Sequence, residues 1–270
     1  GDPSLRSTTW EGLVATYTEQ VRGLADGGVD LLAIESVSDT LNAKAAIFAI
    51  EEYFAQAKRE RPPLVITAVV TDTGKMPCGQ SIEAFLVSVG HARPLSVGVS
   101  GPMGAGATQR ASAALAGVCS AAWCHAVGTG AGDDAGIKAC AEKGLNLAGT
   151  CGLPAKDLAA AAKAVGLARP RVLPDQSSVA PVLRLAGLEV LEVPADSGTL
   201  QLVGQRCNMG GSEKFRGLVD AYKYARQGSW EAAREVCVEQ CDAGADILDF
   251  NFDSELIDAR WAMGKFMRLC

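Results

Sequence analysis

One short unit occurs three times in the chain and constrains the fold more than any other feature. Each copy is the end of a helix, then a glycine, then an apolar run; the copies are Leu24–Ser36, Ala141–Gly152 and Cys241–Asp253. Glycine readily adopts the left-handed conformation that commonly ends a helix. An uninterrupted apolar run is typical of a strand buried on both faces, as in a parallel sheet. The unit therefore predicts helices that lead into parallel strands.

Further runs continue this alternation. Strands are predicted at 64–70, 95–100 and 121–127, and helices at 13–24, 42–57, 80–91, 111–116 and 156–165. Repeated strand–helix units with short connections predict an α/β fold, and so many of them favour a (β/α) barrel over an open sheet. In barrels the chemistry lies at the carboxyl ends of the strands. The residues expected to meet there are Glu35, Asp72, Ser100, His125 and Cys151.

The pattern changes near residue 173. Residues 173–199 contain three prolines and no clear helix, which predicts a linker that packs on a surface. A strand at 200–204, a long helix at 218–242 and an amphipathic helix at 256–269 are predicted to follow. The expected domains are therefore 1–172, a linker at 173–199, and a second domain at 200–270.

Composition excludes several classes of protein. The net charge of -6 and the pI of about 5.1 imply no basic face, so nucleic acid is not an expected partner. No apolar stretch is long enough for a membrane span, and no signal peptide is visible, so a cytoplasmic protein is expected. Because the first residue is glycine, we expect the chain to start inside a longer reading frame.

The cysteine pattern indicates neither a disulfide framework nor a zinc finger. The nine cysteines are odd in number and include no C-x-x-C pair. Most of them are therefore expected to be small buried hydrophobic residues.

Several segments resemble a known family. The stretches "DPSLRSTTWEGLVATYTEQ", "GGVDLLAIESVSDTLNAKAAIFAI" and "VTDTGKMPCGQSIEAF" resemble the homocysteine-binding barrel of cobalamin-dependent methionine synthase. The later stretches "LVGQRCNMGGSEKFRGLV" and "GADILDFNFDSELIDARWAM" resemble the start of that enzyme's folate-binding, or pterin-binding, barrel. The order and spacing of the segments agree along nearly the whole chain.

This resemblance implies an internal segment of a methyltransferase. The fold would be an incomplete (β/α)8 TIM-type barrel followed by the first βα units of a second TIM-type barrel. The parent reaction would transfer a methyl group from methyltetrahydrofolate through cobalamin to homocysteine. Zinc, cobalamin and folate are the implied cofactors and ligands, and the missing domains of the parent enzyme are implied partners.

The resemblance also implies a zinc site, which this sequence only partly retains. In the family three cysteines bind zinc and leave a fourth position for the thiol of homocysteine. Zinc deprotonates that thiol, which can then attack a methyl group. The matching positions here are Gly101, Thr150 and Cys151, so only Cys151 keeps a thiol. The site is therefore expected to be degraded, and the methyltransferase impaired or inactive. A nucleophilic role for Cys151 lacks a visible His–Asp pair to activate it.

A rebuilt metal site is the alternative. Cys124 and His125 lie at the end of a predicted strand near the same mouth as Cys151. Adjacent residues of a strand lie on opposite faces, so both would not reach one metal ion.

Two acidic residues are candidates for binding homocysteine. The resemblance implies that Glu35 contacts the amino group, and its alternative role is to cap the following helix. Asp72 is a similar candidate, although Asp before Thr-Gly also forms ordinary turns. Gly79 and Gln80 match a family segment but also suit a helix start.

Three residues in the second domain are candidates for binding a pterin. Asn208, Asp249 and Asn251 match family positions, and side-chain amides suit the donor and acceptor edge of a pterin. The alternative is that the two amides bond to loop backbone at the strand ends. For the whole chain, the alternatives to a methionine synthase segment are a non-catalytic remnant or scaffold, and a folate-independent homocysteine methyltransferase.

Overall fold

The computed structural model forms two compact units, described here separately. The large unit is Thr8–Ser197 and the small unit is Gly198–Cys270. The described residues are 7–101, 110–111, 113–115, 123–128, 142, 146–150, 159, 162–163, 165–166, 168–169, 172, 181–196, 198–225 and 230–270. No helix among these residues is both long enough and apolar enough to cross a membrane.

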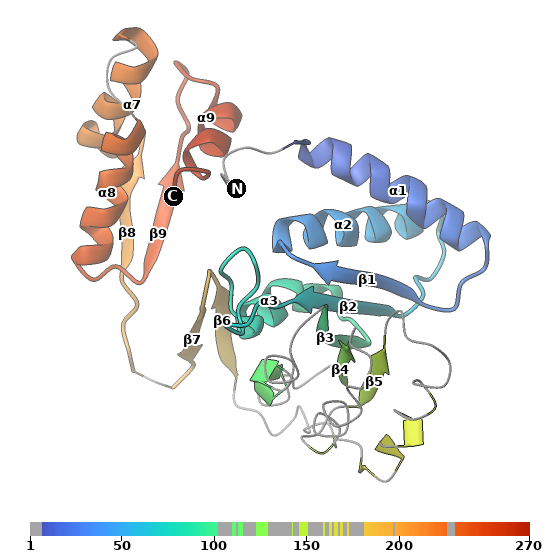
Figure 1. The fold of residues 1–270 in the computed structure, drawn as a ribbon. Coiled ribbons are helices and arrows are strands. Elements are labelled where there is room, and N and C mark those ends of the chain that lie inside the picture. The colour runs from blue at the N-terminus through green and yellow to red at the C-terminus, as the bar shows by residue number, and fades with distance from the viewer. Residues whose placement is uncertain are drawn as a thin grey trace. The chain divides into compact units, whose positions relative to one another are not determined.

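The large unit is built on a parallel sheet. Its strands are β1 (Leu32–Val37), β2 (Leu64–Val69), β3 (Ser96–Gly101), β4 (Trp123–Gly128) and β5 (Leu147–Thr150). They pair in strictly sequential order, β1-β2-β3-β4-β5, and every pair is parallel (Figure 1). Because every pair is parallel, all the carboxyl ends of these strands share one edge of the sheet. The predicted α/β fold with parallel strands is confirmed.

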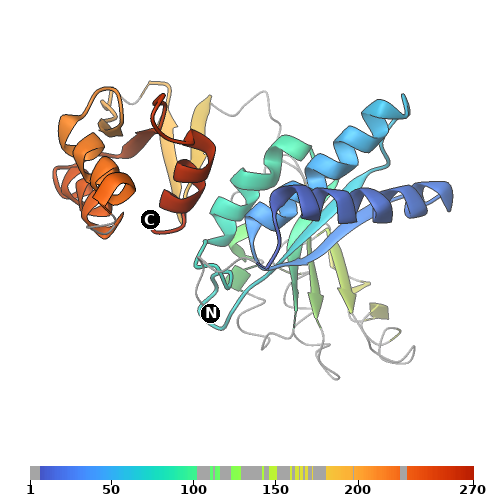
Figure 2. The ribbon, with the colours of Figure 1, turned by 90° about the horizontal axis from the view of Figure 1, so that it is seen from above.

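Helices cover one face of this sheet. They are α1 (Trp10–Asp26), α2 (Thr40–Gln56), α3 (Ile82–Val89) and a short 3-10 helix, η1 (Gly90–Ala92). Thr9, Asp39 and Ser81 precede the three α-helices, and each side chain accepts a hydrogen bond from a backbone N–H of the first turn. The helices predicted at 13–24, 42–57 and 80–91 are confirmed, and α1 and α2 lie alongside each other (Figure 2).

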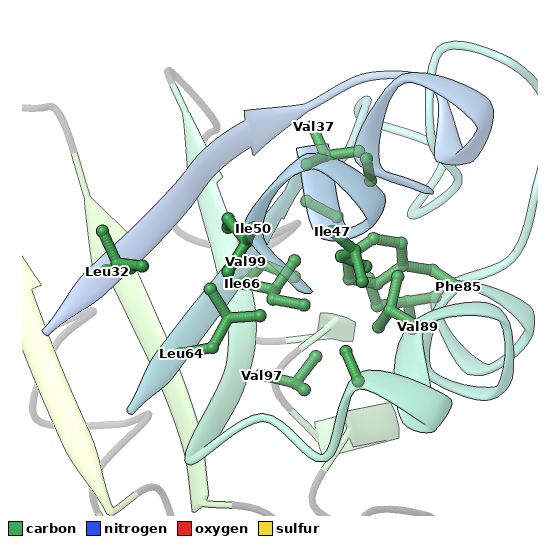
Figure 3. Packing of buried hydrophobic residues seen from close by; sticks show 14 of the residues in the cluster. Leu32, Val37, Ile47, Ile50, Leu64, Ile66, Phe85, Val89, Val97 and Val99 are labelled. Atoms are coloured by element: carbon green, nitrogen blue, oxygen red, sulfur yellow. The ribbon is translucent and has the colours of Figure 1, made fainter. Parts of the chain in front are cut away.

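The core of the large unit is aliphatic and lies between the helices and the sheet. Figure 3 shows side chains of α2 and α3 facing side chains of the strands. The labelled core residues include Ile47, Ile50, Phe85, Val89, Leu64, Ile66, Val97 and Val99. Alternate residues of a strand lie on opposite faces, so Thr67 and Ser100 lie on the face away from this core.

A β-hairpin lies within residues 173–199, where only a linker was predicted. Its strands are β6 (Val182–Ala186) and β7 (Val190–Pro194), and they are antiparallel. The turn contacts the segment before α3: Ser81 N donates to the Leu188 carbonyl over 2.8 Å, and Gln80 Nε2 donates to the Gly187 carbonyl over 2.8 Å. The hairpin belongs to the large unit, and the linker and domain boundaries proposed above stay predictions.

The small unit places helices on two parallel strands. Its elements are β8 (Val203–Asn208), α7 (Glu213–Ala225), α8 (Trp230–Asp242), β9 (Ile247–Asn251) and α9 (Ala259–Phe266). The core is aromatic, with Phe215, Phe252 and Phe266 fully buried and Trp230 stacked on Phe252 at 6.2 Å between ring centroids. The predicted amphipathic helix at 256–269 is confirmed as α9.

The prediction of one long helix over 218–242 is wrong, because the structure has two helices, α7 and α8. The sequence between them contains Gly228 and Ser229. Glycine disfavours a helix interior, and serine favours the position before a helix begins. The apolar spacing continues on both sides and hides this break.

The cysteines of the described residues are mostly exposed. Cys207 and Cys237 are buried, whereas Cys78, Cys241 and Cys270 are exposed, and all five are free thiols. The expectation that most cysteines are buried is therefore wrong for these five. The exposed ones lie in a loop, at a helix end and after a helix, where no core needs filling.

Candidate functional site

The carboxyl edge of the large sheet contains a β-bulge. The register of β1 against β2 shifts between Ile34 and Val37, so Glu35 and Ser36 together stand opposite Thr67. Ser36 adopts a left-handed conformation with φ of 58°, which is uncommon for a residue with a side chain. Bulges frequently lie beside binding sites, where they redirect a side chain.

A cluster of three hydroxyl groups joins the ends of β1, β2 and β3. The Ser36 backbone N–H donates to Thr67 Oγ1 over 3.0 Å, and Ser100 Oγ donates to the same oxygen over 2.9 Å. Ser36 Oγ lies 3.4 Å from Ser100 Oγ. Thr67 and Ser100 are buried, so these bonds are shielded from water. We call Ser36, Thr67 and Ser100 the hydroxyl cluster.

Sequence analysis identified only Ser100 in this cluster. Thr67 was missed, although it is the one polar residue in the apolar run "LVITAVV". A polar residue inside a buried strand requires a partner, and that requirement is the signal that would have identified it. Ser36 follows Glu35 directly, and only the bulge brings it to the cluster.

Glu35 is an exposed residue of β1, next to the hydroxyl cluster in sequence. Its alternative role as a helix cap is wrong. Asp39 caps α2 instead, with Oδ1 accepting a hydrogen bond from Leu41 N over 2.9 Å. The carboxylate of Glu35 at the carboxyl edge therefore has no capping role to explain it.

Asp72 lies in a tight turn directly after β2. Gly74 N donates to the Thr71 carbonyl over 2.9 Å, and Gly74 has a φ of +82°, which favours glycine. The Asp72 carbonyl accepts a hydrogen bond from Arg110 Nη2 over 2.8 Å. Asp72 is exposed, and this geometry fits the turn-forming role that sequence analysis left open.

Gly79 and Gln80 lie just before Ser81, the residue that caps helix α3, which fits the helix-start interpretation. Gln80 is buried, and its Nε2 donates to the hairpin turn and, over 3.3 Å, to Ser88 Oγ. Gln80 therefore connects the hairpin to α3, beside the loop that carries Asp72.

The row of residues at the ends of β3, β4 and β5 offers few metal ligands. Gly101 pairs with Gly128, and Gly128 pairs with Thr150. Glycine has no ligating side chain, and a neutral hydroxyl is a poor zinc ligand. Within the described part of the chain, no group of three or more His, Cys, Asp or Glu residues has the arrangement needed to hold a metal ion.

The remaining predicted metal ligands fall outside what the structure describes. Cys151 lies outside the described residues, and for Cys124 and His125 only the backbone is described. Their backbones pair with Val97 and Gly98, respectively. The rebuilt site therefore stays a prediction.

The two asparagines of the small unit lie opposite each other at the ends of β8 and β9. Asn208 Oδ1 accepts hydrogen bonds from Gly210 N and Gly211 N, each over 2.8 Å. Asn251 Oδ1 accepts one from Asp253 N over 2.7 Å. Both oxygens thus stabilise the chain after their strands, as in Asx turns. Neither Nδ2 group has a partner among the described residues, and each remains a donor for a ligand.

Asp249 is exposed and lies in β9, two residues before Asn251. Half-buried amides and a neighbouring carboxylate therefore occur together at the carboxyl end of the small sheet.

The fold and these strand ends define a class of protein. A parallel α/β sheet with polar groups at its carboxyl edge is the usual frame of a binding or catalytic site in α/β enzymes. A family model described as homocysteine S-methyltransferase matches residues 1–165. The chain therefore belongs to the homocysteine S-methyltransferase family.

Two solved structures are also similar. They are crystal structures of the homocysteine methyltransferase MmuM from Escherichia coli, in an apo form and a metallated form. Each has 18% sequence identity and a TM-score of 0.49. The matches cover 58% and 59% of this chain, and 57% and 54% of the respective MmuM chains. The chain therefore spans a little over half the length of these proteins.

Proposed function

We propose that the large unit binds homocysteine at the carboxyl edge of its sheet, beside the hydroxyl cluster. The observation that carries this proposal is the bulge, which places Glu35 and Ser36 together opposite Thr67. Such a bulge is a costly local arrangement, and here it contains the exposed residue Glu35 next in sequence to Ser36 of the hydroxyl cluster, at the edge where α/β enzymes bind ligands. The family match over residues 1–165 supports homocysteine as the ligand.

Each polar group of homocysteine has a suitable partner type at this edge. The exposed carboxylate of Glu35 suits the substrate ammonium group, and Asp72 is a second carboxylate on the loop after β2. The Ser36 hydroxyl is a donor that suits the substrate carboxylate, whereas the Ser100 hydroxyl donates to Thr67 Oγ1 within the hydroxyl cluster. The hydroxyl cluster keeps the ends of β1, β2 and β3 in register, so these groups are held before the ligand arrives.

We propose further that the chain is a segment of a cobalamin-type methionine synthase with a lost metal site. The positions that match the family's zinc ligands are Gly101, Thr150 and Cys151, and they do not fit zinc, because Cys151 alone offers a thiol and one thiolate does not replace three. Homocysteine would then bind as a thiol, without the metal that lowers its pKa. Methyl transfer would be impaired or absent. The missing zinc ligands also favour a second candidate function, that of a non-catalytic remnant.

The small unit is proposed to be the start of a pterin-binding barrel, and the large unit part of an incomplete (β/α)8 barrel. The sequential parallel order of β1 to β5 supports a barrel wall, because a doubly wound sheet reverses its strand order. The free Nδ2 donors of Asn208 and Asn251, with Asp249 nearby, suit the acceptor edge of a pterin. Folate, cobalamin and the domains of the parent enzyme belong to this proposal.

Equilibrium dialysis with labelled homocysteine tests the binding proposal. We expect Glu35→Gln to weaken binding about 10- to 100-fold, because a charged hydrogen bond to the ammonium group contributes roughly 1.5 to 3 kcal/mol. Glu19→Gln, an exposed change on helix α1, is the matched control and leaves binding unchanged. Equal affinities of the native chain and Glu35→Gln, or no binding at all, would contradict the proposal.

A further inference from the structure

We propose that Cys207 and Cys237, two buried thiols of the small unit, form a reversible disulfide through a relay that begins at the exposed thiol of Cys270. This site is independent of the proposed homocysteine site, which lies in the other unit.

The three sulfur atoms form a continuous chain of contacts. Cys207 Sγ lies 3.5 Å from Cys237 Sγ, and Cys237 Sγ lies 3.9 Å from Cys270 Sγ. Cys207 comes from β8, Cys237 from α8, and Cys270 follows α9. A disulfide bond is about 2 Å long, so each pair would close by a modest rotation of the side chains.

Exposure gives the relay a direction. Cys207 is fully buried and Cys237 is 5% exposed, whereas Cys270 is exposed to solvent. An oxidant in solution therefore meets Cys270 first. Cys237 lies between the other two thiols and is the residue that can bond with either.

The surroundings favour thiol chemistry over metal binding. The only described polar side chain bonded to the sulfurs is that of Gln240, whose Nε2 donates to Cys207 Sγ over 3.2 Å. The remaining neighbours belong to the aromatic core of the small unit. Since the described residues include no arrangement able to hold a metal ion, the thiols are assigned to disulfide exchange.

Electrostatics make the buried thiols slow to react. Burial raises the pKa of Cys237 most strongly, and it also raises the pKa values of Cys207 and Cys270. Three nearby residues also act on these pKa values. Cys241 raises the pKa values of Cys207 and Cys270, and Asp249 raises that of Cys207. Arg234 opposes the rise in the pKa of Cys270. The Arg234 guanidinium only partly offsets the rise at Cys270, so the pKa of this exposed thiol stays above its ordinary value and the first attack becomes faster as the pH rises.

The exchange balances with a small-molecule disulfide, such as oxidised glutathione, as the oxidant. The Cys270 thiolate attacks it, forms a mixed disulfide and releases one glutathione thiol. Cys237 then attacks Cys270 Sγ, releases the second glutathione thiol and leaves a Cys237–Cys270 disulfide. Finally Cys207 attacks Cys237 Sγ, which forms the buried Cys207–Cys237 disulfide and returns Cys270 to the thiol. Two protein thiols are oxidised and one glutathione disulfide is reduced.

Oxidation of the whole folded chain in glutathione buffers of graded ratio tests this scheme. After alkylation of the remaining thiols, intact mass and peptide mapping identify which of the nine cysteines are paired. We expect the loss of two hydrogen atoms per chain and a Cys207–Cys237 cross-link, both reversed by reduced glutathione. A different pair, or no pair while the chain stays folded, would overturn the proposal.

Three variants separate the steps. Cys270→Ser is expected to slow formation of the buried disulfide at least tenfold without changing the final pair, and an unchanged rate would overturn the relay. Cys207→Ser is expected to stop at the Cys237–Cys270 disulfide. Cys78→Ser is the control, because Cys78 is an exposed free thiol of the large unit with no part in the relay, and it leaves both rate and product unchanged. Peptide mapping of the native chain still tests the proposal if the Cys207→Ser variant folds poorly.

Discussion

The strands of the two units end in polar residues that bond in different ways. At the ends of β1, β2 and β3, the hydroxyl cluster joins neighbouring strands through Thr67 Oγ1. At the ends of β8 and β9, Asn208 and Asn251 bond back to their own following loops. The first arrangement depends on the tertiary fold and includes a strained residue, whereas the second is local turn chemistry. A strand-end polar residue is therefore stronger evidence of a site when its bonds cross between strands.

The cores of the two units differ in the kind of side chain that they bury. The large unit buries mainly aliphatic side chains between several helices and five strands. The small unit has two strands and depends on an aromatic cluster that includes Phe215, Trp230, Phe252 and Phe266. Each aromatic side chain buries more area than an aliphatic one, so fewer residues suffice.

The largest expected effects come from deleting one ring in each core. Phe266→Ala and Phe85→Ala each remove a fully buried ring, and each is expected to destabilise its own unit by about 3 to 5 kcal/mol. Hydrogen exchange with peptide resolution measures the two units separately. Phe266→Ala should increase exchange in α7 and α8, and Phe85→Ala in α2 and β2.

The conservative variants Phe266→Leu and Phe85→Leu are the controls, with an expected loss of only about 1 kcal/mol each. If either alanine variant loosened both units equally, the two cores would not be separate, and the division into two units would be wrong.

Thr67→Val tests the hydroxyl cluster at nearly constant volume. The change removes the acceptor of the Ser36 N–H and of the Ser100 hydroxyl, and leaves buried donors unpaired. We expect a loss of about 1 to 3 kcal/mol in unfolding free energy and weaker homocysteine binding. Thr16→Val on the exposed face of α1 is the control, expected to change stability by less than about 0.5 kcal/mol. Chemical denaturation measures the stability, and equilibrium dialysis measures the binding. If Thr67→Val changed neither quantity, the hydroxyl cluster would not stabilise the carboxyl edge of the sheet.

Asn208 allows the turn role and the ligand role to be separated. Asn208→Ala removes the acceptor of two backbone N–H groups, and we expect it to cost about 1 kcal/mol. Asn208→Asp keeps the oxygen but loses the Nδ2 donor, so stability should stay close to that of the native chain. If the small unit binds folate through this amide, Asn208→Asp loses that binding while remaining folded. Thermal denaturation and fluorescence titration with a folate distinguish the two roles.

The smallest effect is expected at the hairpin turn, and it depends on pH. The hydrogen bond and ion pair with Lys75 hold the pKa of Glu189 below its ordinary value of 4.5. A lowered folded-state pKa contributes stability above the unfolded-state pKa, and this contribution is lost as the pH falls through the folded-state value. The melting temperature of Glu189→Gln should therefore lie slightly below that of the native chain at neutral pH, and the two should converge in acid. A difference that is constant across pH would show that the ion pair is not its cause.

Much of the fold was predictable because it depends on burial. The apolar runs at Leu64–Val69 and Ser96–Gly101 are strands buried in the sheet, and such runs are visible in the sequence. The hairpin was missed because its apolar residues do not define a buried face: Leu183 is 57% exposed and Leu188 is 62% exposed. Its position depends on bonds to Gln80 and Ser81, far away in the sequence.

The candidate site was only partly predictable. Glu35 was found because an acid at the end of an apolar run is unusual. Ser36 and Thr67 were not, because their contact follows from a shift in strand register that no local pattern encodes. The glycine and threonine at positions 101 and 150 were recognised from the resemblance, and the register adds that they lie in one row with Gly128.

The most direct test of the central claim is the zinc content of the purified chain, measured beside that of Cys151→Ser. We predict well under one zinc per chain after dialysis against a weak chelator, with the same value in Cys151→Ser, because Gly101 and Thr150 supply no thiolate and the single thiol of Cys151 does not hold zinc alone. Homocysteine should still bind, with equal affinity in zinc and in chelator. Stoichiometric zinc that disappears in Cys151→Ser would mean a rebuilt metal site, and it would contradict the proposed loss of thiol activation.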